Sequence, residues 1–106
     1  MARDEFSEKT KRLISDRAGN FCSNPTCFAL TSGPDSNAGV AKIGVAAHIR
    51  AASPGGPRYD PSMTPKERKS AENGIWLCQI CARLIDIDPE GYPVEKLNGW
   101  KKNAEE

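Results

Sequence analysis

The sequence contains no run of apolar residues long enough to cross a bilayer, and no signal peptide precedes its first expected helix. We therefore expect no membrane partner and a cytoplasmic location. The chain also lacks a strong charge of either sign, because 15 basic and 14 acidic residues leave a formal net charge of +1. This excludes a protein that coats nucleic acid through overall charge alone.

Basic residues nevertheless gather at three places in the chain. One group lies on the first expected helix, the second flanks the only histidine, and the third lies in a later loop. Their members are Lys9, Lys11, Arg12 and Arg17, then Arg50 and Arg58, and finally Lys66, Arg68 and Lys69. Each group is either a local contact for nucleic-acid phosphates or ordinary solvated surface.

The small apolar content limits the size of the core. With 38% hydrophobic residues, 9 glycines and 8 prolines, we expect residues 1–106 to form one small domain that needs a stabilising cross-link. Four cysteines occur as two short-spaced pairs, Cys22 with Cys27 and Cys78 with Cys81. Such pairs on tight turns are typical of a structural zinc site whose four positions are all filled. The alternative is two disulfides in a secreted miniature domain.

A closed four-thiolate site cannot activate water, so any catalysis must lie elsewhere in the chain. The single histidine, His48, stands at the end of an apolar run that begins at Val45. Imidazole exchanges a proton near neutral pH, which makes His48 a candidate general base. The alternative is a histidine that takes no part in chemistry.

Capping and periodicity signals predict helices at four places. Ser7 and Thr64 are expected N-caps, and Thr64 with Glu67 forms the pattern of a capping box. Leu13, Ile14 and Ala18 are expected on the apolar side of the first helix. The predicted helices run from Glu8 to Ala18, from Pro65 to about Glu72, from Ile80 to about Ile87, and onward from Tyr92-Pro93.

The remaining segments predict strands and loops, which makes the fold class a small α+β domain. Residues 31–39 and 52–60 are expected to be loops, since both contain glycine with proline. Residues 40–49 predict a strand or a bent hairpin arm, and residues 75–78 predict a short strand. The predicted order is therefore two strands followed by a helix on a zinc site. That helix is expected to bury Cys81, Leu84 and Ile85.

These residues also carry a family resemblance. The segments concerned are Ala47-His48-Ile49, Asn73, Leu77-Cys78 with Cys81, and Leu84-Ile85-Asp86. The pattern resembles the HNH endonucleases, a family with a zinc-stabilised ββα-metal fold, and it spans Phe21 to Trp100. With Ser53 to Asp60 and Asn73 to Cys78 added, the chain further resembles the HNH modules of CBASS-type antiphage effectors that carry a cyclic-oligonucleotide sensor called SAVED.

The resemblance implies roles for individual residues. His48 corresponds to the general base that deprotonates the attacking water, and Asn73 to the residue that steadies the loop and the base. Asp86, one helical turn beyond Ala82, matches a position where relatives hold the catalytic Mg²⁺ or Mn²⁺ ion. Many relatives carry an acidic residue and a histidine where this chain has Ala47 and Ala82. Arg50 and Arg58 are candidate contacts for the substrate phosphate.

We therefore expect an endonuclease that hydrolyses double-stranded DNA with little sequence preference and leaves 5′-phosphate and 3′-hydroxyl ends. The resemblance further implies an antiphage role and a sensor domain on the C-terminal side. We also expect a homodimer in the active state, because two copies would place two active sites on one duplex and raise the effective concentration. One alternative is a catalytically silent zinc-knuckle module that binds DNA or a protein. Another is a nuclease directed at RNA.

Overall fold

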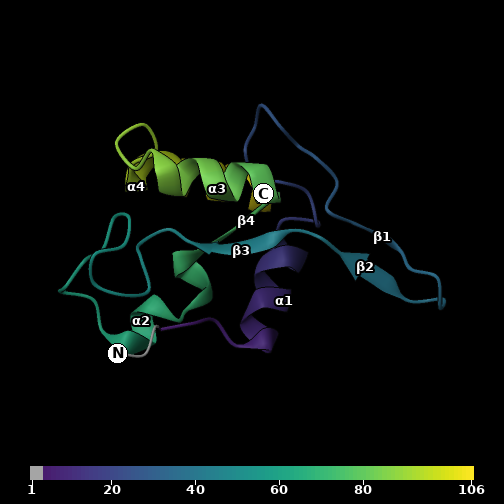
Figure 1. Cartoon of the computed structure of the whole chain (residues 1–106), viewed down its shortest axis with the longest axis horizontal. Coiled ribbons are helices and arrows are strands. Elements are labelled where there is room, and N and C mark those ends of the chain that lie inside the picture. The colour runs from purple at the N-terminus through teal and green to yellow at the C-terminus, as the bar shows by residue number, and fades with distance from the viewer. Residues whose placement is uncertain (1–3) are drawn as a thin grey trace.

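The computed structural model describes residues 4–106, and over these residues the chain folds as a small α+β domain. Its elements follow the order α, three β, α, β, two α (Figure 1). Their bounds are α1 Glu8–Arg17, β1 Ser32–Pro34, β2 Val40–Lys42, β3 Val45–His48, α2 Pro65–Arg68, the 3₁₀ turn η1 Ala71–Asn73, β4 Gly74–Leu77, α3 Gln79–Ile87 and α4 Val94–Glu105. No helix in this described range is both long and apolar enough to cross a bilayer.

A two-stranded antiparallel sheet of β3 and β4 lies at the centre of the fold. Val45 pairs with Leu77, and His48 pairs with Gly74 at the other end of the ladder. Helix α1 covers one face of this sheet, while α3 and α4 cover the other (Figure 1). The strand β4 leads within two residues into α3, so the predicted succession of two strands and a helix is present.

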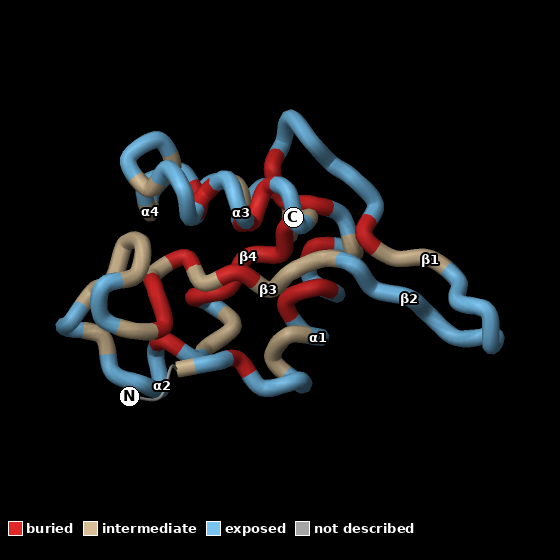
Figure 2. The backbone as a smooth tube through the Cα atoms, viewed as in Figure 1, coloured by how far each residue is buried: buried red, intermediate tan, exposed pale blue. Residues whose placement is uncertain are grey.

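Alternation along β4 divides the core between the two faces, and the buried backbone runs through the centre of the molecule (Figure 2). Ile75 and Leu77 belong to a cluster with Ile85 of α3 and Leu97 of α4. Trp76 belongs to a second cluster on the α1 face, whose other members are Phe6, Ile14 and Ala18. Successive side chains of a strand point to opposite faces, which explains the split.

Gly74 is required by close packing next to the histidine. A Cβ atom at this position would collide with the side chain of Ile14 and would lie 3.0 Å from Cζ of Phe6. Because Gly74 pairs with His48, the absence of a side chain lets α1 and the segment before it approach the end of β3.

Two residues that were predicted to lie in the core, Leu13 and Leu84, are exposed. In α1, Ile14 and Ala18 are buried as expected, but Leu13 is 48% exposed. In α3 the buried residues are Cys81, Ala82 and Ile85, and Leu84 is 39% exposed. Cys81 must face its fellow cysteines, and this fixes the rotation of α3 so that Ala82 and Ile85, rather than Leu84, meet the sheet.

Two predicted boundaries also change. The expected loop 31–39 contains β1, which pairs with β2 in a protruding hairpin whose turn is held by two backbone N–H groups donating to Oδ1 of Asp35 (Figure 1). The helix expected to reach Glu72 ends at Arg68. There the side chain of Asn73 donates to the Arg68 carbonyl at 3.1 Å, and the chain turns into η1.

Candidate metal centre and adjoining cleft

The four cysteines form one cluster. Their sulfur atoms all lie within 4.8 Å of one another, and Sγ of Cys27 is 3.9 Å from Sγ of Cys78. Four thiolates around a tetrahedral zinc ion, with Zn–S bonds of about 2.3 Å, stand about 3.8 Å apart. All four cysteines are free thiols rather than two disulfide pairs. The cluster could therefore hold a zinc ion.

Local hydrogen bonds shape the two cysteine turns. Oδ1 of Asn24 accepts from the backbone N–H of Thr26 at 3.1 Å, and the Cys27 N–H donates to the Asn24 carbonyl at 2.9 Å. Nδ2 of Asn24 lies 3.5 Å from Sγ of Cys81, across the cluster. Cys78 is the N-cap of α3, and its sulfur accepts from the Cys81 N–H at 3.4 Å. Asn24 thus supports the cysteine cluster. The sequence did not identify this role, because its place in a polar turn gave no specific signal.

A zinc ion would have to displace the thiol protons, and the thiol pKa values show how firmly each proton is held. Burial raises the pKa of Cys22 and raises that of Cys81 to about 12. Burial also acts to raise the pKa of Cys78, but hydrogen bonds from the Cys81 N–H and from neighbouring thiols outweigh it and lower the value. Zinc binds thiolates and releases their protons, so its retention should weaken as the pH falls.

A cleft of about 460 Å³ follows the edge of β3. The segment before α1 contributes Glu5, and α3 contributes Ala82 and Asp86. His48 and Asp86 therefore line the same cleft although they come from different elements. The rest of the lining consists of Val45, Ala46, Ala47, Ala51, Ser53, Gly56 and Pro57. Ala47 and Ala82 line this space as small side chains.

The ring of His48 is held by the segment that precedes α1. Nε2 lies 2.9 Å from the Asp4 carbonyl oxygen, and the ring stacks on Phe6 with centroids 3.9 Å apart and planes inclined by 7°. Neither Asp4 nor Phe6 was predicted to contact the histidine. The predicted N-cap at Ser7 places Phe6 just before α1, but no local sequence signal predicts its contact with a residue in β3.

Asn73 fixes the backbone that follows His48. Its side chain is buried, accepts from the Arg50 N–H at 2.9 Å, and donates to the carbonyls of Arg50 and Arg68 at 3.0 and 3.1 Å. The Ile49 N–H donates to the Asn73 carbonyl at 2.9 Å. This arrangement suits a supporting role rather than contact with substrate, and Asn73 does not line the His48 cleft.

We expect Asn73→Ala to lower the free energy of unfolding by about 3 kcal/mol, because a buried donor set is lost and the Arg50 and Arg68 backbone groups lose their partner. Urea unfolding in the presence of zinc measures this. Asn98→Ala, on the exposed surface of α4, is the matched control and should change the value by less than about 0.5 kcal/mol. Equal effects of the two variants would contradict the supporting role of Asn73.

Asp86 is accessible from the cleft. Its side chain is 55% exposed, and Oδ1 lies 3.4 Å from Nη2 of Arg58. No hydrogen bond in the described part of the chain involves Oδ2. An ion pair at this exposure contributes little to stability, so the carboxylate can take another cationic partner at small cost.

Arg58 is an internal anchor. Its side chain is 5% exposed and donates to the carbonyls of Ile49 at 2.7 Å and Ile85 at 2.8 Å. Burial lowers the pKa of Arg58, and the Asp86 carboxylate opposes this effect. The guanidinium therefore ties the loop 52–60 to the residue that follows β3 and to α3. It is not presented to a phosphate in the cleft.

Arg50 also lies away from the His48 cleft. It pairs with Asp60 at 2.9 Å and lines a separate shallow cleft with Arg58 and Tyr59. Hydrogen bonds from Ser62 and the charge of Arg50 hold the pKa of the Asp60 carboxyl below its ordinary value. The structure thus brings His48 and Asp86 to one cleft. Arg50 lines another cleft, and Arg58 pairs with Asp86 but is not among the residues that line the His48 cleft.

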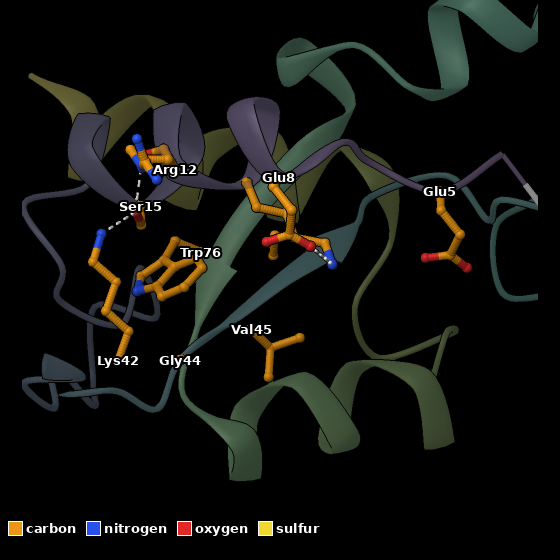
Figure 3. A pocket seen from close by; sticks show the side chains of 10 residues that line it. Glu5, Glu8, Arg12, Ser15, Lys42, Gly44, Val45 and Trp76 are labelled. Atoms are coloured by element: carbon orange, nitrogen blue, oxygen red, sulfur yellow. Dashed lines mark hydrogen bonds and ion pairs between the residues drawn. The ribbon is translucent and has the colours of Figure 1, made fainter. Parts of the chain in front are cut away.

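A neighbouring cleft of about 520 Å³ shares Glu5, Val45 and Ala46 with the first (Figure 3). Arg12 and Lys42 stand at one end of it, on either side of Ser15, which accepts from Lys42 Nζ at 3.3 Å. Glu5, which also lines the His48 cleft, stands at the other end (Figure 3). This cleft is larger than the His48 cleft, but no imidazole lines it. Its basic side chains could contact a phosphate backbone.

A comparison of the chain with models of known protein families gives no match, and a comparison with curated protein sequences gives no significant match.

Proposed function

We propose that this chain is a metal-dependent endonuclease of the HNH type, which hydrolyses phosphodiester bonds of DNA with little sequence preference. The observation that carries the proposal is the common cleft of His48 and Asp86. The succession of β3, β4 and α3, with a cysteine cluster at the β4–α3 junction, supports the proposed ββα-metal core. The resemblance of the residues to effector modules supports a role in antiphage defence.

The chemistry needs a water aligned opposite the leaving oxygen, a base for its proton, and positive charge near the phosphate. His48 serves as the base. Asp86 and Glu5 supply hard oxygen ligands, which suit Mg²⁺ or Mn²⁺ because such ions keep several waters and need only one or two protein carboxylates. When bound, the ion would stabilise the negative charge that develops on the phosphate.

Substrate binding should be weak and sensitive to salt. Arg58 is committed to backbone carbonyls, so a DNA backbone would have to use the cations of the neighbouring cleft, which are Lys11, Arg12 and Lys42. Because the net charge is only +1 and few phosphates would be contacted, DNA binding should release few counterions. Firm binding would then depend on a further domain, such as a cyclic-oligonucleotide sensor beyond α4, or on a second copy that raises the effective concentration.

Supercoiled plasmid tests the proposal directly. The protein, loaded with zinc, should convert supercoiled DNA to nicked and then linear forms in Mg²⁺ or Mn²⁺. A chelator that removes these ions but leaves the thiolate-bound zinc in place should stop the reaction. A labelled RNA duplex in parallel decides between DNA and RNA as substrate. Intact nucleic acid under all conditions would refute the proposed activity.

One observation favours a second candidate, a silent zinc-knuckle module that binds DNA or a protein. Within residues 4–106, the four cysteines are the only group of three or more potential ligand side chains found close together. His48, Asp86 and Glu5 line one cleft but are not preassembled as a ligand set. A module of this kind would retard DNA in a gel without cutting it, and the plasmid assay separates the two functions.

We expect Asp86→Ala to raise the Mg²⁺ concentration needed for half-maximal cleavage by about tenfold or more, because one of two carboxylates in the cleft is lost. Asp86→His should recover activity better in Mn²⁺ or Ni²⁺ than in Mg²⁺, since imidazole suits these softer ions. Metal titrations of the cleavage rate measure both effects. Asp88→Ala, on the exposed end of α3, is the control. Unaltered metal dependence of Asp86→Ala would move the ligand role to another residue.

A further inference from the structure

The segment immediately before α1 makes three consecutive approaches to the cleft that contains His48. The Asp4 carbonyl meets Nε2 of the ring at 2.9 Å, Glu5 lines the cleft, and Phe6 covers one face of the imidazole. This segment lies more than forty residues from His48 in sequence and outside the β3, β4 and α3 unit.

The contact with Asp4 decides the tautomer of the neutral ring. A carbonyl oxygen only accepts hydrogen bonds, so Nε2 must carry the proton and donate it. In a neutral imidazole the lone pair then resides on Nδ1, which becomes the nitrogen able to accept a proton. The nearly parallel stack on Phe6, with planes inclined by 7°, restricts rotation of the ring about its bond to Cβ.

The segment is itself firmly anchored. The Asp4 N–H donates to the Ala52 carbonyl at 3.1 Å, and the Asp4 carboxylate pairs with Nη1 of Arg68 at 3.2 Å. Both partners of this pair are largely buried, with 19% of the Asp4 side chain and 10% of the Arg68 side chain exposed. Phe6 is 4% exposed and belongs to the core cluster under α1. A backbone held at three points presents its carbonyl in a constant place.

We propose that Asp4 and Phe6 form a positioning element that sets the tautomer and the plane of the His48 ring. The catalytic consequence rests on the proposed nuclease function, but the tautomer does not. Neither residue touches substrate in this account, since both act through His48. The segment before α1 is then part of the working site rather than a lead-in to the first helix.

The single histidine makes the test unambiguous, because the protein gives one set of imidazole ¹⁵N signals. At roughly pH 8, where an ordinary imidazole is neutral, the protonated and unprotonated nitrogens have well-separated shifts. We expect the wild-type signals to report Nε2–H as the dominant tautomer. Phe6→Leu, which keeps an apolar side chain but removes the flat face, should shift the signals toward a mixture of tautomers and lower kcat about tenfold with KM nearly unchanged.

Ile14→Val is the matched control, because it also weakens the cluster under α1 but leaves the Phe6 ring in place. It should lower the melting temperature without moving the His48 signals. A wild-type protein with Nδ1–H dominant would overturn the proposal, whether or not Phe6→Leu folds. So would unchanged signals in a folded Phe6→Leu. If the tautomer behaves as expected but no variant cleaves nucleic acid, the positioning stands and the nuclease function fails.

Discussion

His48→Ala should reduce plasmid cleavage by about a thousandfold or more while zinc content stays at one ion per chain. A positioned general base contributes about 10²- to 10⁴-fold to a rate, and this chain has no second histidine to replace it. The structural cost should be small by comparison, since the losses include one stacked contact with Phe6 and one hydrogen bond to the Asp4 carbonyl, each worth about 1 kcal/mol. Initial nicking rates and a thermal melt measure the two effects separately.

His48→Gln is the control that separates chemistry from packing. Its amide can still donate to the Asp4 carbonyl, but it cannot take a proton from water at neutral pH. It should therefore be as inactive as His48→Ala and more stable. If His48→Gln retains wild-type activity, His48 is not the base, and the common cleft with Asp86 loses its catalytic meaning.

Removal of zinc should unfold the protein. Structural zinc sites contribute about 10–16 kcal/mol of apparent binding free energy, whereas a domain of this size has a net stability of about 5–15 kcal/mol. The free energy of zinc binding is thus as large as the whole net stability of the domain. Cys78→Ser should accordingly yield an unfolded or aggregating chain, because Cys78 is both a ligand candidate and the N-cap of α3.

Elemental analysis and circular dichroism test this prediction together. Purified wild-type protein should contain one zinc per chain, lose its helical signal when a strong chelator extracts the metal, and recover it when zinc is returned. Asn37→Ala, in the exposed turn of the β1–β2 hairpin, should leave the zinc content unchanged. Well-folded protein with far less than one zinc per chain would show that the cysteines are not a metal site.

The parts of the fold that the sequence predicted are those with a local signal. Ser7 caps α1 and Thr64 forms the capping box of α2, as predicted. Both could be predicted because each interaction joins residues only three positions apart in the sequence. The cysteine spacings likewise predicted one cluster, since each pair lies on its own tight turn. The strand at Ile75 and the antiparallel partner ending at His48 follow from short apolar runs.

The parts that escaped prediction depend on neighbours distant in sequence. Leu84 is exposed because the orientation of Cys81 sets the rotation of α3, and Arg58 is buried because three carbonyls from different segments converge on it. The contacts of Asp4 and Phe6 with His48 likewise join chain segments that only the tertiary fold brings together. Single-residue patterns identified the histidine and the aspartate, but they could not identify what holds the imidazole in place.

The chemical identity of the cleavage products tests the central claim most directly. A defined, end-labelled DNA duplex is incubated with zinc-loaded wild-type protein and with His48→Ala in Mg²⁺, and the termini of the fragments are determined. Hydrolysis by a water that His48 deprotonates predicts 5′-phosphate and 3′-hydroxyl ends from the wild type and no fragments above background from the variant. Intact duplex from both proteins, or identical fragments from both, would contradict the account.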